Sequence, residues 1–405
     1  DITYNEEQKK AIKQALIKNF SIITGGPGTG KTTIIKGITQ GYKMISGYSF
    51  DKLKERMVLL APTGRAAKRM SESCLYPAST IHRYLKWNKE TGEFGYNERN
   101  KSPAEFIIVD ETSMIDIDLM ANFFKAMKND VKIVFIGDYN QLESVGPGKV
   151  LKDLIESEMI NTIFLKEIYR QDQNSYITEL AYEVNSGELT ESFLEKKDDY
   201  NFIKCDSTDA LKATTDVCKL AIKKGYDLKN IQVLAPMYKG YNGIDNLNKV
   251  LQKVFNPPSD EKEETYDMDV VYREGDKVLQ LENMPDVNVF NGDIGFIERI
   301  NGNEITVDFD GNKVKYKPKD YKAIKHGYAI SVHKSQGSEF EIVVMPVINE
   351  YRIMLYKKLV YTAITRAKRS LILLGDPLSF SKAVYNKGNK ERNTNLKNIL
   401  TSNIL

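Results

Sequence analysis

The 405-residue sequence is poor in cysteine, with three, and in tryptophan, with one. Because Cys74, Cys205 and Cys218 are scattered, the sequence predicts neither a disulfide framework nor a zinc site, and a reducing, cytoplasmic setting is expected. The sequence also lacks a run of about twenty apolar residues, so no membrane-spanning helix and no membrane partner are expected. The first ten residues, DITYNEEQKK, have no apolar core and are not a signal peptide.

A strong excess of charge of either sign is also missing. The 58 Lys and Arg residues nearly balance the 55 Asp and Glu residues, which gives a formal net charge of +3. This value does not identify a nucleic-acid-binding protein, so any such binding must come from local patches. The length is typical of two or three globular domains. The last fifteen or so residues are rich in Asn and Lys and are expected to be poorly ordered.

One stretch that is present, SIITGGPGTGKTT at 21–33, contains the phosphate-binding pattern G-x-x-x-x-G-K-[ST] as Gly25-x4-Gly30-Lys31-Thr32. A short apolar run precedes it as a predicted strand, and a predicted helix follows. The glycines let backbone N–H groups turn toward phosphate oxygens, and the helix N-terminus adds its positive dipole end. We expect Lys31 to reach the β- and γ-phosphates and the Thr32 hydroxyl to bind Mg²⁺. The sequence therefore predicts a nucleoside-triphosphate site.

Apolar runs of strand length alternate with helical segments over residues 1–150. Such runs stand at 56–62, 105–111 and 132–138, and each ends in a polar turn, as fully buried parallel strands do. The alternation predicts a doubly wound α/β sheet, whose ligands bind at the carboxyl ends of its strands. A second α/β pattern follows between about 230 and 376.

Two segments interrupt this alternation. Residues 84–100 are polar and aromatic with a Thr-Gly turn, which predicts a β-hairpin that stands out from the sheet; an ordinary surface loop is the alternative. Residues 270–325 contain short alternating strands with Gly, Asn and Asp turns, which predict a small antiparallel barrel inserted in the second α/β domain.

Polar residues with catalytic potential follow two of the predicted strands. Asp110 can hold Mg²⁺, usually through water, and Glu111 can polarise the attacking water, which is the pairing that phosphoryl transfer needs. Gln141, within GDYNQLESVGPG at 137–148, is expected near the γ-phosphate, where a neutral amide can orient water or report the phosphate. Plain solvation of the acidic pair and an Asn/Gln-rich turn are the alternatives.

The order of these motifs resembles that of superfamily 1 helicases, and most closely that of RecD-like DNA helicases. In the first half of the chain, NEEQKKAI is similar to the adenine-reading segment and GGPGTGKTT to the first motif, and two strand-gripping motifs are matched by LAPTGRAAKRM (60–70) and STIHRYL (79–85). VDETSMID is similar to the second motif and GDYNQLESVGPG to the third. The fourth motif is matched by LKEIYRQ (165–171), the fifth by AISVHKSQGSEFE (329–341) and the sixth by LVYTAITRAKRSLILLG (359–375). The resemblance covers nearly the whole chain, and the family's amino-terminal accessory region is expected to be absent, since the chain begins at the adenine-reading segment.

The resemblance implies an α/β fold of two RecA-like P-loop NTPase domains, at 1–165 and 166–405. It implies that the hairpin at 84–100 is a pin that splits the duplex and that the barrel at 270–325 is SH3-like. The implied function is an ATP-dependent DNA helicase that uses ATP and Mg²⁺, moves 5′ to 3′ on single-stranded DNA and opens duplex junctions. An RNA helicase of the same superfamily and a non-unwinding, nucleotide-gated subunit of a DNA repair complex are the alternatives.

The resemblance also implies roles for residues of the nucleotide site. Lys31, Glu111 and Gln141 are expected to be catalytic, together with two arginine fingers, Arg170 and Arg366. Arginine suits this role because its planar fork donates to two phosphate oxygens and stays charged. The expected nucleotide-binding residues are Gln8, Gly26, Pro27, Gly28, Thr29, Gly30, Lys31, Thr32, Thr33, Asp110, Tyr169, Gly337 and Glu339, with Thr32 and Asp110 binding Mg²⁺. A packed core position is the alternative for Tyr169.

Contacts with the nucleic acid are implied at loop tips, where hydroxyls, amides and backbone N–H groups suit phosphates without reading sequence. The implied residues are Pro62, Thr63, Gly64, Arg65, Thr80, His82, Trp87, Tyr238, Asn242, Ser331, His333 and Lys334. For His82 and His333 a structural role stays open. Trp87 either stacks on the last base pair or packs the base of the hairpin onto its domain.

Overall fold

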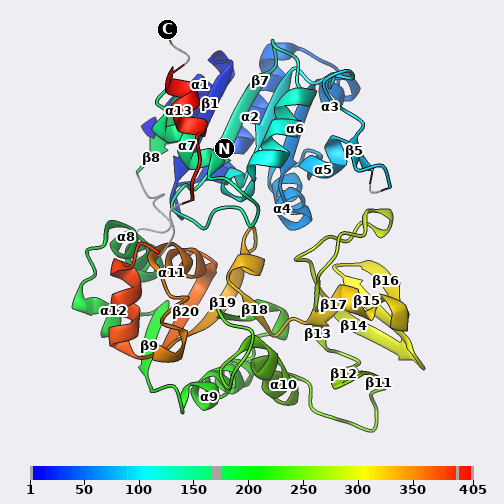
Figure 1. Cartoon of the computed structure of the whole chain (residues 1–405), viewed down its shortest axis with the longest axis vertical. Coiled ribbons are helices and arrows are strands. Elements are labelled where there is room, and N and C mark those ends of the chain that lie inside the picture. The colour runs from blue at the N-terminus through cyan, green and yellow to red at the C-terminus, as the bar shows by residue number, and fades with distance from the viewer. Residues whose placement is uncertain (1–2, 89, 167–174, 389–391, 403–405) are drawn as a thin grey trace. The chain divides into compact units, whose positions relative to one another are not determined.

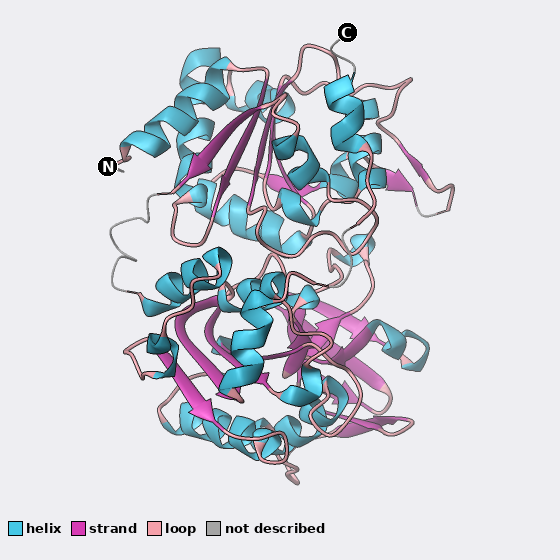
Figure 2. Cartoon of the chain, turned by 60° about the vertical axis from the view of Figure 1, so that its left-hand side comes forward, coloured by secondary structure: helices cyan, strands magenta, loops and turns pink. Residues whose placement is uncertain are grey.

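The computed structural model describes residues 3–88, 90–166, 175–388 and 392–402 (Figure 1). The chain divides into two compact units: a first unit of residues 1–174 and 389–405, and a second unit of residues 175–388. Each unit contains a parallel sheet with helices on both of its faces (Figure 2), so the predicted α/β class is confirmed. The segment 389–405 was predicted to lie in the second domain, whereas the structure groups it with the first unit.

The first unit is built on a six-stranded parallel sheet of order β3-β2-β6-β7-β1-β8. Its strands are β1 (Phe20–Gly25), β2 (Met57–Ala61), β3 (Ala78–Thr80), β6 (Phe106–Val109), β7 (Lys132–Gly137) and β8 (Asn161–Leu165). Neighbouring residues of one strand enter different cores: Ile22 and Phe135 pack on one face, and Ile23 and Ile136 on the other. Side chains alternate along a strand, so a strand covered on both faces needs a continuous apolar run.

Eight helices of the described residues belong to the first unit. They are α1 (Glu6–Ile17), α2 (Lys31–Ser46), α3 (Phe50–Arg56), α4 (Gly64–Cys74), α5 (Ile81–Tyr84), α6 (Ile117–Ala126), α7 (Val150–Glu156) and α13 (Leu396–Ser402). None of the helices in the described part of the chain is long and apolar enough to span a bilayer.

The hairpin predicted at 84–100 forms a sheet of its own, β4 (Trp87–Asn88) with β5 (Glu93–Phe94). Trp87 pairs with Phe94 and Asn88 with Glu93 in an antiparallel ladder. Gly92 has a φ of 68°, a left-handed conformation that glycine adopts without strain, and this explains the Thr-Gly turn.

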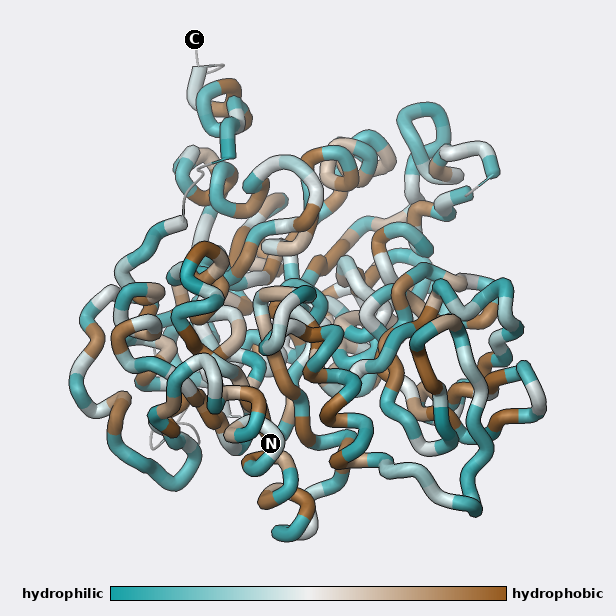
Figure 3. The backbone as a smooth tube through the Cα atoms, turned by 60° about the horizontal axis from the view of Figure 1, so that its bottom comes forward, coloured by the Kyte–Doolittle hydropathy of each residue, from teal (hydrophilic) through white to brown (hydrophobic). Residues whose placement is uncertain are grey.

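The second unit contains a five-stranded parallel sheet of order β18-β10-β19-β20-β9. The strands are β9 (Tyr200–Lys204), β10 (Ile231–Ala235), β18 (Ala329–Ser331), β19 (Phe340–Val347) and β20 (Ala367–Gly375), and the helices are α8 (Tyr176–Ser186), α9 (Ala210–Lys223), α10 (Ile244–Phe255), α11 (Lys357–Ile364) and α12 (Pro377–Tyr385). Many inner stretches of the tube are apolar, and many outer loops are polar (Figure 3).

The predicted barrel is an antiparallel five-stranded sheet of order β16-β15-β14-β13-β17 with an apolar core of its own. Its strands are β13 (Lys277–Gln280), β14 (Ile294–Asn301), β15 (Glu304–Phe309), β16 (Asn312–Tyr316) and β17 (Ile324–His326), and the two-stranded ribbon β11 (Glu264–Asp267) with β12 (Val270–Arg273) precedes it. Short 3₁₀ helices lie at Thr112–Met114, Glu191–Leu194, Leu228–Asn230, Pro285–Val287, Pro318–Ala323, His333–Ser335 and Asn349–Tyr351.

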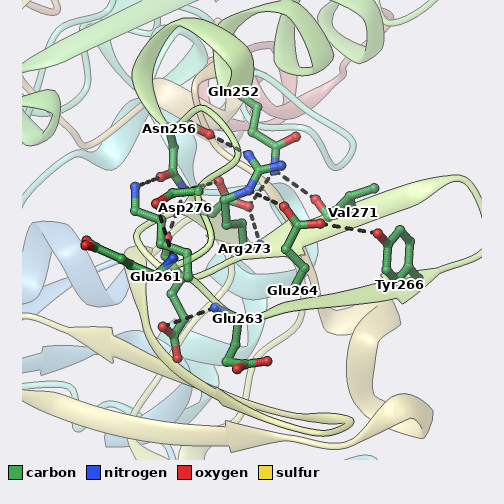
Figure 4. A network of polar contacts seen from close by, with 12 residues as sticks. Gln252, Asn256, Glu261, Glu263, Glu264, Tyr266, Val271, Arg273 and Asp276 are labelled. Atoms are coloured by element: carbon green, nitrogen blue, oxygen red, sulfur yellow. Dashed lines mark hydrogen bonds and ion pairs between the residues drawn. The ribbon is translucent and has the colours of Figure 1, made fainter.

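A buried carboxylate, Asp276, joins the barrel to helix α10 (Figure 4). Five donors surround it: the side-chain amides of Gln252 and Asn256 and the hydroxyl of Tyr328, each at 2.7 Å, the backbone N–H of Arg273 at 2.8 Å and the Nε2 of His326 at 3.1 Å. Burial by itself raises the pKa of Asp276, but the hydrogen bonds outweigh burial, so the pKa lies below its ordinary value. The ionised carboxylate is therefore a structural part of the junction.

Replacing Asp276 with alanine is expected to lower the free energy of unfolding by about 3–5 kcal/mol, because the buried donors lose their acceptor. Chemical denaturation followed by circular dichroism measures this loss. Asp269→Ala is the matched control, because Asp269 is exposed near the same ribbon and its removal is expected to change little.

Since the pKa of Asp276 is lowered, the stabilisation that its carboxylate provides is complete above about pH 4 and declines as the pH falls through the lowered pKa. A constant difference between wild type and variant down to pH 2 would contradict this assignment.

Candidate nucleotide site

The phosphate-binding loop connects the end of β1 to the start of α2. Gly28 and Gly30 have φ values of 72° and 77°, and a Cβ on Gly30 would collide with the Nε2 of Gln8. The loop is closed by the Thr29 hydroxyl, which donates to the Gly26 carbonyl at 2.9 Å. The predicted glycines therefore stand where the backbone requires them.

The ammonium of Lys31 lies within this loop. Its Nζ donates to the carbonyl oxygens of Gly25 at 2.8 Å and of Gly26 at 2.7 Å. These bonds hold a positive charge beside the N-terminus of α2, whose free N–H groups also favour an anion. Pro27, Thr32 and Thr33 lie on the same loop and first helical turn, as predicted from the motif.

Gln8 supports the loop from helix α1. Its Oε1 accepts from the N–H of Asn5 at 3.1 Å, and Asn5 in turn accepts from the N–H of Gln8 at 2.8 Å, which is a capping box. The Nε2 of Gln8 donates to the carbonyl of Thr29 at 3.4 Å. Gln8 therefore links α1 to the loop, and its contact with adenine stays a prediction.

The acidic pair follows strand β6, at the same carboxyl edge of the sheet. Asp110 is buried, and one of its oxygens accepts from the N–H of Glu111 at 2.8 Å. Burial and the neighbouring charge of Glu111 raise the pKa of Asp110 above its ordinary value, and the cations Arg69 and Lys31 oppose this shift. A bound cation would therefore be favoured beside Asp110.

The donors near the loop fit Mg²⁺ in kind, because a carboxylate and a hydroxyl are hard oxygen ligands. Asp110 supplies the carboxylate and the exposed Thr32 the hydroxyl. Within the described ranges, no group of three or more His, Cys, Asp or Glu side chains forms a cluster suited to a metal. Any Mg²⁺ here would depend on phosphate and water for its other ligands, as is usual for this ion.

The third-motif loop follows strand β7 at the same edge. Gln141 is buried, and its Nε2 donates to Asp138 at 3.3 Å, while the N–H of Tyr139 donates to the hydroxyl of Thr24 in β1 at 3.4 Å. The loop is thereby attached to the strand that leads into the phosphate-binding loop.

Arg392 holds the far end of this loop. Its guanidinium donates to the carbonyls of Ser144 at 2.5 Å, Gly146 at 2.6 Å and Gly148 at 2.7 Å. Helix α13 then packs on the first-unit core through Leu396 and Leu400. The expectation that the last fifteen or so residues are poorly ordered is wrong for 392–402, because these contacts lie far away in sequence and leave no local signal.

Two predicted strand-gripping threonines cap helices. The Thr63 hydroxyl accepts from the N–H of Ala66 at the start of α4, and the Thr80 hydroxyl accepts from Arg83 at the start of α5, each at 3.2 Å. Pro62, Gly64 and Arg65 lie on the same loop and first turn as Thr63. Their contact with a nucleic acid stays a prediction.

The aromatic residues at the base of the hairpin form a cluster. The ring of Trp87 lies 4.6 Å from that of Phe94 and 6.4 Å from that of His82, between centroids. Burial lowers the pKa of His82, so its neutral form is favoured. Trp87 keeps 44% of its surface exposed beside a cavity of about 690 Å³ between the hairpin and α6. The packing alternative for Trp87 is thus supported, and a face for stacking is still available.

Predicted residues of the second unit are held mainly by protein contacts. The buried amide of Asn242 donates to the carbonyl of Ser207 and to Glu350, which is a structural role. Lys334 donates to Asn291 of the barrel at 2.6 Å, and the Tyr238 hydroxyl donates to Ser331 at 3.5 Å. His333 begins a 3₁₀ helix beside Lys334.

The predicted arginine finger Arg366 is buried in the second unit. It donates to the carbonyls of Thr362 at 3.1 Å and Ser338 at 2.9 Å. It therefore lies beside Gly337, whose φ is 70°, and near Glu339, which pairs with Lys368 at 3.6 Å. The other predicted finger, Arg170, and Tyr169 lie outside the described residues.

A lysine lies in a glycine-rich loop at the end of β1, and an acidic pair follows β6, which is separated from β1 by β7 in the same parallel sheet. This combination defines a P-loop NTPase domain. Residues 3–208 match the AAA domain family, residues 247–309 the SH3 domain of ATP-dependent RecD-like DNA helicases, and residues 326–374 the UvrD-like helicase C-terminal domain. The chain therefore belongs to the AAA domain family, and its two other matched segments resemble domains of RecD-like and UvrD-like helicases.

Similar proteins are consistent with this assignment. The ATP-dependent RecD2 DNA helicase of Deinococcus radiodurans is 32% identical over 97% of this chain and 52% of its own length. The RecBCD enzyme subunit RecD of Buchnera aphidicola subsp. Schizaphis graminum is 28% identical over 93% of this chain and 74% of its own. The chain thus spans about half of the first relative. The Pif1 helicase from Bacteroides in complex with ADP-AlF3 and ssDNA shares the fold, with a TM-score of 0.54 at 16% identity over 96% of this chain and 95% of that one.

Proposed function

We propose that this chain is an ATP-dependent DNA helicase that moves on single-stranded DNA and opens duplex junctions. The observation that carries the proposal is the convergence of Lys31, Asp110 and Glu111 at one edge of the first sheet, in a chain of RecD-like architecture. Lys31 would bind the β- and γ-phosphates of ATP, and Glu111 would polarise the attacking water. The curated relative with the highest identity reported above is itself named an ATP-dependent DNA helicase.

Mg²⁺ would be held by Thr32 and, through water, by Asp110. The ion would supply positive charge to the phosphate oxygens, and the raised pKa of Asp110 favours a cation at that position. The nucleotide roles implied by the resemblance are also proposed for the remaining residues of the site: Gln8, Gln141, Gly337, Glu339, Arg366, Arg170 and Tyr169.

The single DNA strand is proposed to contact three segments: the loop at 62–65, the start of α5 and the fifth motif near Lys334. These segments offer backbone N–H groups and cations, which bind phosphates of any sequence, so affinity is expected to fall as salt rises. The free thiols of Cys74, Cys205 and Cys218 fit the reducing cytoplasm as the location.

Unwinding of tailed duplexes tests the proposal. With ATP and Mg²⁺, the chain is expected to unwind a duplex with a 5′ single-stranded tail and to leave the same duplex with a 3′ tail intact. Replacing the DNA tail with an RNA tail tests the alternative that the chain is an RNA helicase. Hydrolysis that does not respond to either tail, or a nucleotide-dependent complex that never unwinds, would favour the nucleotide-gated subunit instead.

A further inference from the structure

An ion pair restrains the carboxylate proposed to polarise water. The Nη2 of Arg69 donates to the Oε1 of Glu111 at 2.7 Å, and the side chain of Glu111 is only 12% exposed. Bonds of this length between a guanidinium and a carboxylate are at the strong end of the range, and limited exposure reduces competition from water. The pair therefore occupies one of the two oxygens on which catalysis would depend.

The main chain at Glu111 is held in place, so only its side chain is able to change direction. Glu111 has a φ of 52°, a left-handed conformation that is unusual for a residue other than glycine. Its N–H is fixed by Asp110, and its neighbour Thr112 donates to the carbonyl of Ile136 at 2.9 Å. Because the main chain is held on both sides, the partner of the carboxylate decides where it points.

Arg69 belongs to the helix that begins at the proposed strand-binding loop. Arg65 and Arg69 are four residues apart on α4, so they lie on the same face one turn apart. The opposite face is buried through Ala66, Ala67 and Met70, and α4 also packs against α2, the helix that follows the phosphate-binding loop. A shift of the first turn of α4 is thus transmitted directly to the guanidinium of Arg69.

We propose that Arg69 is a positioning residue that withholds Glu111 from water until a DNA strand binds at 62–65. This inference rests on the proposed helicase function and on the proposed role of Glu111. Without DNA, the ion pair keeps the carboxylate turned toward α4. Phosphates bound at the start of α4 attract Arg65 and move the helix turn that carries Arg69, so Glu111 is released to accept a proton from water. Arg69 thereby couples strand binding to turnover.

The adjacency of strands β2 and β6 makes this contact possible. Helix α4 leaves the end of β2, and Glu111 leaves the end of β6, so a long cation one turn into α4 reaches the acidic residue on the neighbouring strand. Sequence alone shows two arginines in GRAAKRM but not the order of the strands.

The test compares steady-state ATPase rates of the full chain at saturating ATP and Mg²⁺, without DNA and with saturating oligo-dT. Arg69→Ala is expected to raise the DNA-free rate by about 5–10-fold, in the lower range of allosteric couplings. The DNA-saturated rate should stay within about twofold, so the stimulation ratio falls. Arg69→Lys keeps a charge without the planar fork, and is expected to give an intermediate ratio.

Lys68→Ala is the matched control, because it removes a cation from the exposed side of the same helix and should leave the ratio as in wild type. If Arg69→Ala has no thermal unfolding transition, Arg69→Gln replaces it in the same assay, because glutamine keeps most of the aliphatic part of the arginine side chain. If wild type is stimulated by DNA but Arg69→Ala lowers the DNA-free and DNA-saturated rates equally, or leaves the stimulation ratio unchanged, the proposed role of Arg69 is wrong. The proposed function is unaffected by that result. A wild type whose hydrolysis ignores DNA would instead refute the proposed function, and the inference with it.

Discussion

Lys31→Ala is expected to abolish ATP hydrolysis, whereas Glu111→Gln is expected to bind ATP and fail to turn it over. Lys31 is the side chain whose ammonium lies within the phosphate-binding loop, held by Gly25 and Gly26. Glutamine has nearly the shape of glutamate but cannot accept a proton from water, and loss of a general base typically costs about 10²–10⁴-fold in rate. Binding of a fluorescent ATP analogue and release of phosphate measure the two steps separately.

Lys43→Ala is the control for Lys31→Ala, because Lys43 is exposed in the last turn of the same helix, far from the loop. It should hydrolyse ATP as the parent does. Parental turnover by Glu111→Gln in the presence of DNA would show that another group activates the water.

The second expected result concerns strand separation. Replacing residues 88–93 with Asn-Gly would join Trp87 to Phe94 through a two-residue turn and keep their ring contact. DNA-stimulated ATPase and movement along single strands should persist, since they need only the nucleotide and strand sites. Unwinding should fall about tenfold or more, because a base-pair step costs about 1.4 kcal/mol to open and this energy corresponds to a factor of ten in rate.

A stopped-flow assay on a 5′-tailed duplex measures unwinding, and the thermal transition verifies folding. Keeping Phe94 and Tyr96 matters, because Tyr96 packs against Tyr84 and its N–H donates to the carbonyl of Leu85. Unwinding at the parental rate would place the wedge outside the hairpin. Loss of ATPase as well would assign the hairpin to the stability of its domain.

The features of the fold and of the loops at the candidate site that agree with the prediction come from local patterns. The glycines of the phosphate-binding loop, the acidic pair after β6 and the apolar runs of the strands depend on residues adjacent in sequence, so short motifs identify them. The hairpin and the barrel were likewise indicated by turn residues and alternation. Roles assigned to individual residues stay predictions where no contact of the described chain tests them.

The remaining features depend on which elements become neighbours. The pair of Arg69 with Glu111 requires β2 beside β6, and the buried amide of Asn242 requires Glu350, 108 residues away. The capping box of Gln8 was readable from NEEQ, since Asn followed three residues later by Gln is a known helix start. That signal was present and was interpreted only as a nucleotide contact.

The contact of Arg392 with the third-motif loop has a consequence for biosynthesis. A chain leaves the ribosome N-terminus first, at about 5–20 residues per second, and domains generally fold as they emerge. The six-stranded sheet is complete in sequence at Leu165, yet the carbonyls of Ser144, Gly146 and Gly148 receive their guanidinium only after more than two hundred further residues. During synthesis, these contacts of the third-motif loop can therefore form only after the whole of the second unit has been made.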